Sequence, residues 1–471
     1  MATTISGTGV LDVNAIVTAL MGVERLPITK LDTKEKNESA KISAYGLIKS
    51  QVATFQSAVA ALGSTSVSKF SAFKTTSSDT TALSATAGST AVVGTYSVNV
   101  TSLAQSQKLV AVGQASKTTA ISNGVATTVT FDFGTIGGGT LSAGVYSGAT
   151  FTTNGGGTKI VTIDSTNNTL EGIRDAINLA KIGATASIVN DGSGTPFRLA
   201  LSSDKGGLSN SIKITTSGGD GTIGTLLGYD PGGLPAAQKL NQTVASQNAV
   251  FDVNGIAINK TSNTVTDAIN GVSLTLSKVT TSAVTLTVAR DSTAVTDAAT
   301  GFVKAFNDLY TAVKNSSAYK SKSALEGDST LRALQSQLRS IASDVASGGT
   351  LTSLYQAGVT FKNDGTLQLE SAKLSNALAT DYSDVTNLFS GATGFATKFD
   401  ALATATLSAG GTIPARITRI EDGIKKIGVE RDALELRMKT IEQSYRFQYS
   451  QLNVLLGSMN QTSAYLTQQL R

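Results

Sequence analysis

Apolar residues recur every three or four positions near both ends of this chain, which is the spacing of one face of a helix. Within residues 31–62 the stripe consists of Ile42, Tyr45, Ile48, Val52, Phe55, Val59 and Leu62. Pro27 precedes it, at a place where the first turn of a helix tolerates a missing N–H group. The pattern predicts a long amphipathic helix that ends at Gly63.

The C-terminal stripe is longer and follows a heptad. Its apolar positions are Ile413, Ile417, Ile420, Ile424, Ile427, Leu434, Met438, Ile441, Tyr445, Leu452, Leu455, Met459 and Leu466. Only Arg431, Gln448 and Thr462 interrupt it. A helix over these residues would be about 80 Å long. A period of 3.5 residues predicts a left-handed coiled coil.

The middle of the chain has the pattern of strands. From about Thr75 to Arg290, alternating runs such as "TYSVNV" and "VSLTLSKV" are separated by glycine clusters such as "GTIGGGTLSAG". Helical spacing returns over about 292–320, 329–346 and 374–399. Between these helices, Asp364-Gly365 joins two short alternating runs, as in a hairpin.

The order of these patterns predicts a multidomain α+β protein. Long N- and C-terminal helices form a coiled-coil leg, and β-rich outer domains are inserted into a helical body that carries a β-hairpin. The expected segments are an N-terminal leg helix (1–42), a helical body (43–74 with 291–425), a β-rich domain (75–124 with 241–290), an inserted outer β-rich domain (125–240) and a C-terminal leg helix (426–471).

Two similar stretches lie within the β-rich region. Asn168–Asn178 and Asn263–Asn270 each combine a polar start with an Ala-Ile-Asn ending. This similarity indicates either a repeated unit of short helix and strand or a chance resemblance in a sequence rich in a few residue types. We expect a short helix in both stretches.

Composition excludes several classes of function. The 471 residues include no His and no Cys, so the usual Ser-His and Cys-His nucleophiles and zinc ligands cannot form. A net charge of +5, spread along the chain, gives no reason to expect a nucleic-acid surface. The N-terminus lacks a basic segment before its apolar stretch and makes a poor secretory signal. No uninterrupted apolar run is long enough to span a bilayer.

Two short motifs have the residue spacing of known enzyme motifs, but the sequence around them does not fit those enzymes. Gly219-Asp-Gly-Thr-Ile-Gly224 has the spacing of a dinucleotide fingerprint but precedes a loop-like sequence rather than a helix. The Ser-x-x-Lys strings at Ser66 and Ser317 lack the companion motifs of a Lys-activated serine. We therefore expect no enzyme activity, no cofactor and no metal.

The last residues raise the question of what covers them. Residues 447–470 carry no charge, and their apolar face widens beyond a single stripe, as a helix with more than one neighbour requires. We infer legs that are loose in the monomer and become ordered on assembly. The expected assembly surface comprises Leu452, Leu455, Leu456, Met459, Tyr465, Leu466 and Leu470 at the C-terminus, with Leu11, Ile16, Leu20, Ile42, Tyr45, Val52 and Phe55 on the N-terminal leg.

Several passages resemble the filament-capping family of the bacterial flagellum, the second hook-associated proteins. They are "GTGVLDVNAIVTALMGVERLPITKL", "ISAYGLIKSQVATFQSAV", "GTYSVNVTSLAQSQKL" and the closing "RMKTIEQSYRFQYSQLNVLLGSMNQTSAYLTQQL". The passage "TLEGIRDAINLAKIGATASIVNDGSGTPFRLALSS" is similar to inserts shared by flagellins and hook-associated proteins. The resemblance covers nearly the whole chain, apart from about 113–157.

The resemblance implies a secreted protein at the distal tip of the filament, exported through the flagellar type III channel. It implies a homo-oligomeric ring of about five or six copies that promotes folding and polymerisation of exported flagellin and prevents its leakage. Other implied partners are the hook–filament junction protein and a cytoplasmic export chaperone on the C-terminal segment; nucleic-acid binding and membrane insertion are not expected.

Other functions stay open on the residues alone. The Thr/Ser-rich β domains could act as an adhesin for host glycan or mucin, which would add cell adhesion to a role in motility. A hydrolase would need a carboxylate pair, and none is identifiable. Flagellin and the junction proteins are structural alternatives, against which the order of the quoted passages favours the cap family.

Overall fold

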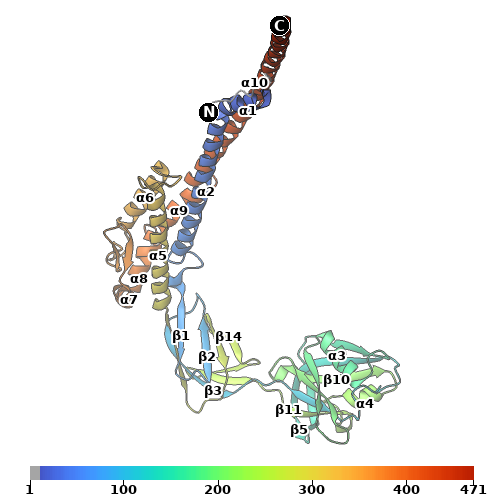
Figure 1. Ribbon diagram of the computed structural model, residues 1–471. Helices are drawn as coiled ribbons and strands as arrows, with labels where there is room; N and C mark the ends of the chain where they lie inside the picture. Colours follow the sequence, from blue (N-terminus) through green and yellow to red (C-terminus); the bar gives the residue numbers. More distant parts are fainter. Residues whose placement is uncertain (1–10, 471) are drawn as a thin grey trace. The chain divides into compact units, whose positions relative to one another are not determined.

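The computed structural model describes residues 11–470 (Figure 1). These residues form two compact units, which are described separately. A helical unit contains residues 11–70 and 292–470, and a β-rich unit contains residues 71–291. The predicted α+β architecture, with a β-rich middle inserted into a helical protein, is confirmed.

The helical unit begins with two helices where the sequence predicted one leg helix over 1–42. Its described part is divided at Arg25, which separates α1 (Val13–Glu24) from α2 (Leu26–Ala60). Asp12 caps α1 by accepting a hydrogen bond from the Ala15 amide. Pro27 lies in the first turn of α2, where no amide donor is needed. The part of this segment over residues 1–10 lies outside the described residues.

The remaining helices build the body and the second leg. They are α5 (Ser292–Ser317), α6 (Ser329–Ala342), α7 (Ser371–Thr380), α8 (Tyr382–Ser390), α9 (Phe395–Leu407) and α10 (Thr412–Gln469). The 58 residues of α10 form one helix, and Ile413, Ile420 and Ile427 are buried at intervals of seven. The heptad predicted from the sequence is therefore the packing period in this part of α10.

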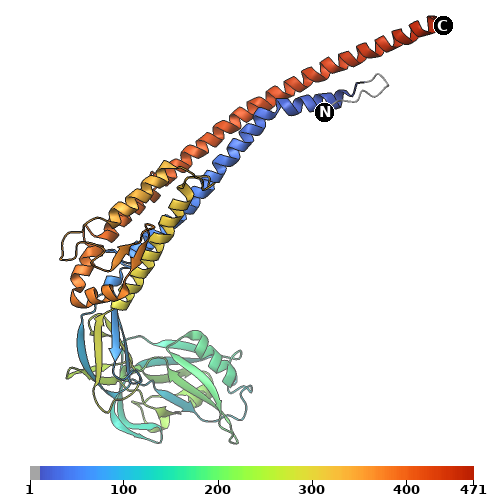
Figure 2. The ribbon, with the colours of Figure 1, turned by 60° about the vertical axis from the view of Figure 1, so that its left-hand side comes forward.

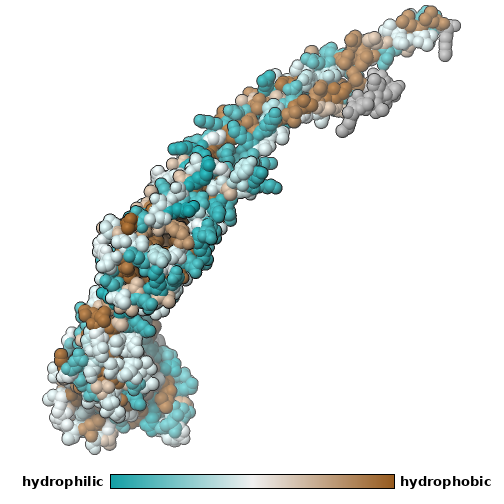
Figure 3. All heavy atoms as spheres, turned by 90° about the vertical axis from the view of Figure 1, so that its left-hand side faces the viewer, coloured by the Kyte–Doolittle hydropathy of each residue, from teal (hydrophilic) through white to brown (hydrophobic). Residues whose placement is uncertain are grey.

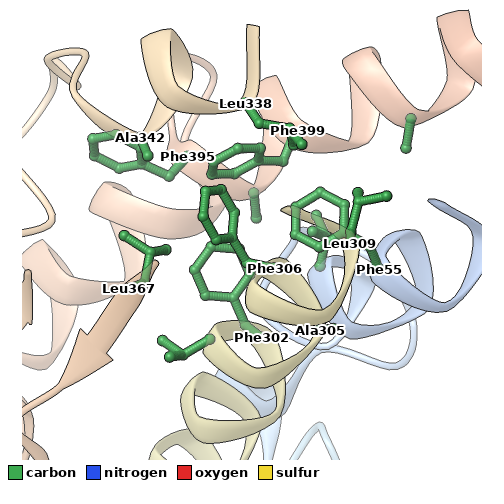
Figure 4. Close-up of a cluster of buried hydrophobic side chains, with 14 of the residues drawn as sticks. Phe55, Phe302, Ala305, Phe306, Leu309, Leu338, Ala342, Leu367, Phe395 and Phe399 are labelled. Carbon is green, nitrogen blue, oxygen red and sulfur yellow. The ribbon is translucent and has the colours of Figure 1, made fainter. Parts of the chain in front are cut away.

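Aromatic side chains fill the centre of the helical body (Figure 4). Phe55 of α2 lies between Phe302 and Phe306 of α5 and Phe399 of α9, with ring centroids 5.3–6.1 Å away. The Phe55 and Phe399 rings meet edge to face, a geometry that aromatic pairs prefer. Three helices that are distant in the sequence are thereby joined into one core.

The predicted hairpin is confirmed beside this core. Strands β17 (Val359–Phe361) and β18 (Leu367–Leu369) pair antiparallel. Gly365 has a φ of +90°, which favours glycine, and the Asp364 carboxylate accepts hydrogen bonds from the amide and hydroxyl of Thr366. The Asp-Gly pair thus makes the turn for which the sequence selects it.

The β-rich unit starts and ends at the same place. Strand β1 (Phe73–Ser77) pairs with β16 (Val284–Arg290), and Phe73 lies opposite Arg290. The amide of Asp291 donates to the carbonyl of Ala72. An insertion whose ends meet in this way can join the helical unit through two neighbouring chain crossings.

All strand pairs of this unit, within the described residues, are antiparallel. Two sheets form around one core: β1-β16-β3-β12-β13 and β14-β15-β2. Their other strands are β2 (Leu83–Ala87), β3 (Gly94–Ser102), β12 (Ala249–Val253), β13 (Ile256–Lys260), β14 (Thr264–Ile269) and β15 (Val272–Leu276).

Two further sheets, β10-β5-β6 with β7 on β5, and β11-β4-β9-β8, enclose a second core with helices α3 and α4. The elements are β4 (Lys108–Ala111), β5 (Thr127–Ser142), β6 (Val145–Thr153), β7 (Lys159–Ile163), α3 (Leu170–Ala180), β8 (Ala184–Asn190), β9 (Phe197–Ser203), β10 (Ser211–Gly218), α4 (Thr222–Leu227) and β11 (Leu240–Val244). Leu109 and Leu240 belong to this core, whereas Ala104 and Ala249 pack in the first one.

Two local expectations are wrong. Asn263–Asn270 is not helical: it contains strand β14, whose Val265 and Ile269 are buried against β15, because sheet pairing outweighs a short local pattern. The Asn263 side chain instead bonds the backbone of Ala104. In addition, the six-residue helix α4 does follow Gly221, although the sequence indicated a loop there.

None of the helices in the part of the chain that the structure describes is both long enough and apolar enough to cross a lipid bilayer.

Candidate assembly surface on the helical leg

The two ends of the chain run side by side as a helical leg, formed by α1, α2 and α10 (Figure 2). Beyond the helical body, a small apolar cluster joins them. Val17 and Met21 of α1, Ile28 of α2 and Met438 of α10 are buried together. The intramolecular helical hairpin therefore forms, and the uncovered part of the leg is shorter than the sequence led us to expect.

Polar contacts follow the same seam. Nη2 of Arg25 lies 2.5 Å from Oε1 of Glu435 on α10. Nη1 of Arg431 on α10 lies 2.8 Å from Oε2 of Glu35 on α2. Arg431 interrupts the predicted heptad, and its ion pair with α2 explains why a charged residue is accepted at that position. These groups are between a third and a half exposed, so each pair adds a modest stability but restricts how the helices can be aligned.

Nearer the C-terminus, α10 is fastened to α1 by hydrogen bonds. The Tyr445 hydroxyl donates to Glu24 at 3.1 Å, and this contact raises the pKa of the tyrosine. Arg446 donates to the side chain of Asn14 at 2.8 Å. The amide of Leu11 donates to Asn453 Oδ1 at 3.0 Å.

Beyond Asn453, α10 continues for four more turns without a helical partner among the described residues (Figure 2). Leu455, Met459 and Leu466 are 56%, 59% and 53% exposed. Apolar side chains are visible along this part of the helix in Figure 3. Because residues 447–470 carry no charge, this surface can bind only through apolar and neutral polar contacts.

The predicted C-terminal residues lie together on this uncovered end. Leu452, Leu455, Met459, Leu466 and Leu470 are exposed and share one face, and Leu456, at its edge, is half-buried. Tyr465 is exposed on another face of the helix. The structure thus brings most of the predicted set into one stripe.

The predicted N-terminal residues divide into two groups. Leu11, Ile16, Leu20 and Ile42 are half-buried. Tyr45, Val52 and Phe55 have exposures of 0–1% in the core of the body, so a neighbouring subunit cannot reach them. They are core residues because α2 supplies one wall of the helical body as well as part of the leg.

Sequence reasoning missed the residues that hold α1 on α10. The buried pair on α1 is Val17 and Met21, one position beyond the expected Ile16 and Leu20. On α10 the contact face passes through Tyr445, Tyr449 and Asn453, and not through Gln448 and Leu452. The spacing of four between Val13, Val17 and Met21 was the signal that could have indicated this face.

A second apolar stripe follows the outer side of α10. The sequence indicated a wider apolar face near the C-terminus but not that this stripe extends back to Val429. Val429, Leu436, Phe447, Val454 and Tyr465 are each 61–71% exposed. They are separated by seven and eleven residues in turn, so the pattern repeats every 18 residues, or five helical turns. The free end of α10 therefore presents two apolar faces, which is the surface expected of a helix with two neighbours.

The acidic side chains bear on whether this protein could hold a metal ion. Over residues 11–470, no cluster of three or more acidic side chains is arranged to hold a metal ion. The contacts that the structure shows along the leg are apolar packing, hydrogen bonds and ion pairs.

The sequence matches known proteins over almost its full length. Residues 9–107 match the N-terminal profile of flagellar hook-associated protein 2, and residues 246–461 match the C-terminal profile. The Escherichia coli K12 flagellar hook-associated protein 2 is 37% identical over 98% of this chain and 96% of its own length. The B-type protein of Pseudomonas aeruginosa PAO1 is 32% identical over 98% of this chain and 96% of its own length.

The fold is also similar to a solved structure. The crystal structure of the D1-D2-D3 domains of the Escherichia coli flagellar cap protein FliD aligns with a TM-score of 0.66 and 37% identity. The alignment covers 80% of this chain and 99% of that structure. With both terminal profiles, full-length relatives and the fold in agreement, this chain belongs to the flagellar hook-associated protein 2 family.

Proposed function

We propose that this chain caps the flagellar filament, as a ring of about five or six copies at the distal tip. There it would promote the folding and polymerisation of exported flagellin and prevent its loss to the medium. Membership of a family that includes solved flagellar cap proteins supports this role. The ring would keep one subunit position open for the next flagellin.

The observation that carries the proposal is the uncovered end of α10. It exposes apolar residues on two faces and has no charged side chain between Arg446 and Arg471. Such a helix is poorly stabilised alone, because most helical stability in proteins comes from packing of an apolar face. We infer that it is covered in the assembly by flagellin, by neighbouring cap subunits or by the hook–filament junction protein.

The same end would need cover before assembly. We propose that a cytoplasmic export chaperone binds residues 447–470 and is released as the chain enters the flagellar type III channel. The absence of cysteine fits a chain that is secreted unfolded and must refold outside the cell without an oxidation step. In this account the chaperone and the assembled tip use one surface at different times.

We also propose where the boundaries between the domains lie. Leg and body would meet near 42/43 and 425/426, since Tyr45 and Ile420 share the body core whereas Ile28 and Met438 share the leg cluster. Within the β-rich unit, the domain boundary would lie between Ala104 and Leu109 and again between Leu240 and Ala249, where the core changes. These two β-rich domains would form the outer plate of the cap.

A deletion strain with plasmid-borne variants tests the role. Loss of the gene should leave hook–basal bodies and release unpolymerised flagellin, and the wild-type gene should restore filaments. We expect L455E/M459E/L466E to fail, because three carboxylates would be placed on the apolar face. N460E/Q468E, which adds charge to exposed polar positions of the same helix, should restore filaments.

Secretion has to be measured in the same strains. If the triple variant reaches the medium in normal amount and flagellin still leaks, the defect is in assembly at the tip. If the deletion strain itself builds normal filaments without flagellin loss, the capping role is refuted.

A further inference from the structure

We propose that strand β13 (Ile256–Lys260) is a docking edge at which a second copy of this chain adds its own β13, antiparallel, so that two sheets become one. The strand ends the sheet β1-β16-β3-β12-β13 and pairs only with β12 within residues 11–470. A two-fold contact of this kind joins chains in pairs, whereas a ring is closed by contacts between unlike surfaces. The proposal therefore does not depend on the capping role.

Two other edge strands of the β-rich unit are closed by a side-chain amide. On β8, Asn178 Oδ1 accepts from the Ala186 amide at 2.7 Å, and Asn178 Nδ2 donates to the Ala186 carbonyl at 2.9 Å. Gln238 makes the same two contacts with Tyr146 of β6, both at 2.8 Å. A side-chain amide presents a donor and an acceptor as a peptide group does, so each one takes the place of a neighbouring strand.

The hairpin of the helical unit is closed in the same way. Asn307 Oδ1 accepts from the Leu367 amide of β18 at 2.6 Å, and Asn307 Nδ2 donates to the Leu367 carbonyl at 2.8 Å. An unpaired strand edge is a template for another strand, and proteins commonly cover such edges. Three closures of one kind indicate that strand addition is prevented at these edges, which makes an open edge informative.

The direction of the backbone groups of β13 follows from its pairing with β12. In an antiparallel sheet, successive residues direct their N–H and C=O groups alternately to the two neighbouring strands. The Asn254 amide donates to the Ser97 carbonyl on the β3 side at 2.8 Å. The preceding residue, Val253, therefore directs its groups to β13, where it lies opposite Ile256. Alternation along β13 from Ile256 then fixes which residues face away from the sheet.

Ala257 and Asn259 are the residues that direct their N–H and C=O groups to the open side. Both are exposed, and within the described part of the chain no backbone or side-chain group pairs with these four groups. One side-chain amide is near, but Asn248 donates to the side-chain oxygen of Asn259, at 2.6 Å, and not to its backbone. The edge thus presents two donors and two acceptors with the spacing of a strand.

This edge is complementary to itself. When two copies of β13 run antiparallel with Ile258 opposite Ile258 of the second copy, all five residues of each strand are paired. Ala257 of each copy then lies opposite Asn259 of the other, and the free groups form four backbone hydrogen bonds across the contact. Every other antiparallel register leaves residues of β13 unpaired or turns these groups away.

The side chains fit the same register. Ile256 is 70% exposed, and pairing places it opposite Lys260 of the second copy, whose methylene groups can cover it. The two lysines do not face each other, so like charges are kept apart. A lysine on an edge strand commonly keeps other strands away. The Lys260 ammonium group lies 2.6 Å from Asp267 of its own chain, and this ion pair weakens that protection.

A single engineered thiol tests the contact, because the chain contains no cysteine. In the proposed register the two Cα atoms at position 258 are about 4.5 Å apart, within the range of a disulfide. We expect dilute full-length Ile258→Cys, treated with oxidised glutathione, to give a covalent dimer on a non-reducing gel. The matched control is Ser187→Cys, exposed on the closed edge strand β8, which should dimerise at least about tenfold more slowly.

Proline variants separate strand pairing from random collision. Ala257→Pro or Asn259→Pro, each combined with I258C, removes one free N–H group at a position where an edge strand tolerates proline. Cross-linking should fall to the rate of S187C in whichever variant retains the wild-type melting temperature under reducing conditions. Equal rates for I258C and S187C, or a rate that proline leaves unchanged, would overturn the proposal. A disulfide from I258C to single-cysteine flagellin in place of the covalent dimer would also overturn it and assign the edge to that chain.

Discussion

Arg431 of α10 donates a hydrogen bond of 2.8 Å from Nη1 to Oε2 of Glu35 on α2. Each residue interrupts an apolar stripe on its own helix, and the leg places the two interruptions opposite each other. Asp32 lies 3.8 Å from the same guanidinium group. Opposite charges at matching turns favour one alignment of α2 along α10 and disfavour slipped alignments, in which a charge would face an apolar side chain.

Charge reversal tests this alignment. Arg431→Glu should lower the free energy of unfolding by about 1 kcal/mol in low salt, because an exposed attraction is replaced by repulsion from Glu35 and Asp32. The double variant E35R/R431E should recover most of the loss. Thermal unfolding of the full-length protein, followed by circular dichroism, measures the coupling, which should shrink in 1 M salt.

The exposed pair Asp422 and Lys425 provides the control, because both residues lie on α10, 3.2 Å apart. D422K/K425E should leave stability unchanged. A coupling of zero between positions 35 and 431 in low salt would contradict a role for that pair in alignment.

Tyr45 predicts a loss of stability at high pH. Its hydroxyl donates to Asp328 at 2.6 Å, and burial, followed by this hydrogen bond, raises the pKa of Tyr45 from 10.0 to about 12. Because the folded state favours the protonated phenol, the contribution is complete below pH 10 and is lost as the pH rises toward about 12.

Tyr45→Phe cannot ionise, so the difference in stability between wild type and variant should narrow between pH 9 and pH 12. Below pH 9 the variant should be less stable by about 1–2 kcal/mol, the usual effect of one lost hydrogen bond to a charged group. Urea unfolding at each pH measures both effects. A difference that is constant across this range would show that Tyr45 does not titrate with folding.

Gln107 should contribute to the stability of the second core of the β-rich unit, which contains Leu109 and Leu240. Its side chain is fully buried, accepts from the Ile212 amide at 2.6 Å and donates to Gln242 at 2.5 Å. Gln107→Leu would leave a buried amide donor and a buried acceptor unpaired, at a cost of about 1–3 kcal/mol each. Gln105→Leu, at an exposed position, is the control, and an equal effect on urea unfolding would disprove the argument.

Two glycine substitutions should change the stability of the helical unit in opposite directions. Gly365→Ala places a methyl group at a φ of +90° and against the ring of buried Tyr310, so we expect a loss of about 2–4 kcal/mol. Gly301→Ala lies in the exposed middle of α5 with no atom near the added carbon and should stabilise by about 0.5–1 kcal/mol. Melting temperatures of the two variants on the same side of the wild type would contradict this assignment.

Much of this fold could be predicted from the sequence, because the patterns that specify it are local and repeated. Ile413, Ile420 and Ile427 are spaced by a heptad, and all three are buried. Asp364-Gly365 specifies a turn through the backbone freedom of glycine. The uncharged C-terminal stretch indicated an uncovered helix end without any knowledge of its neighbours.

Other features depend on contacts between distant segments. The stretch Asn263–Asn270 reads as helix locally but lies in a sheet, since Val265 and Ile269 are buried by pairing with β15. The path of the leg seam through Tyr449 and Asn453 depends on how α1 approaches α10 after the break at Arg25, which no pattern in α10 records. The burial of Tyr45, Val52 and Phe55 likewise follows from α5 and α9, which pack on the same face of α2.

Amide hydrogen exchange along α10, compared between dilute monomer and assembled filament tips, tests the central claim most directly. In the monomer we expect slow exchange from Ile413 to about Tyr445, where partner helices cover the apolar face, and fast exchange from Val454 to Gln469. In the assembled tip, 454–469 should become protected. Slow exchange of 454–469 already in the monomer, or no gain of protection on assembly, would contradict the view that this helix end is covered only by other subunits.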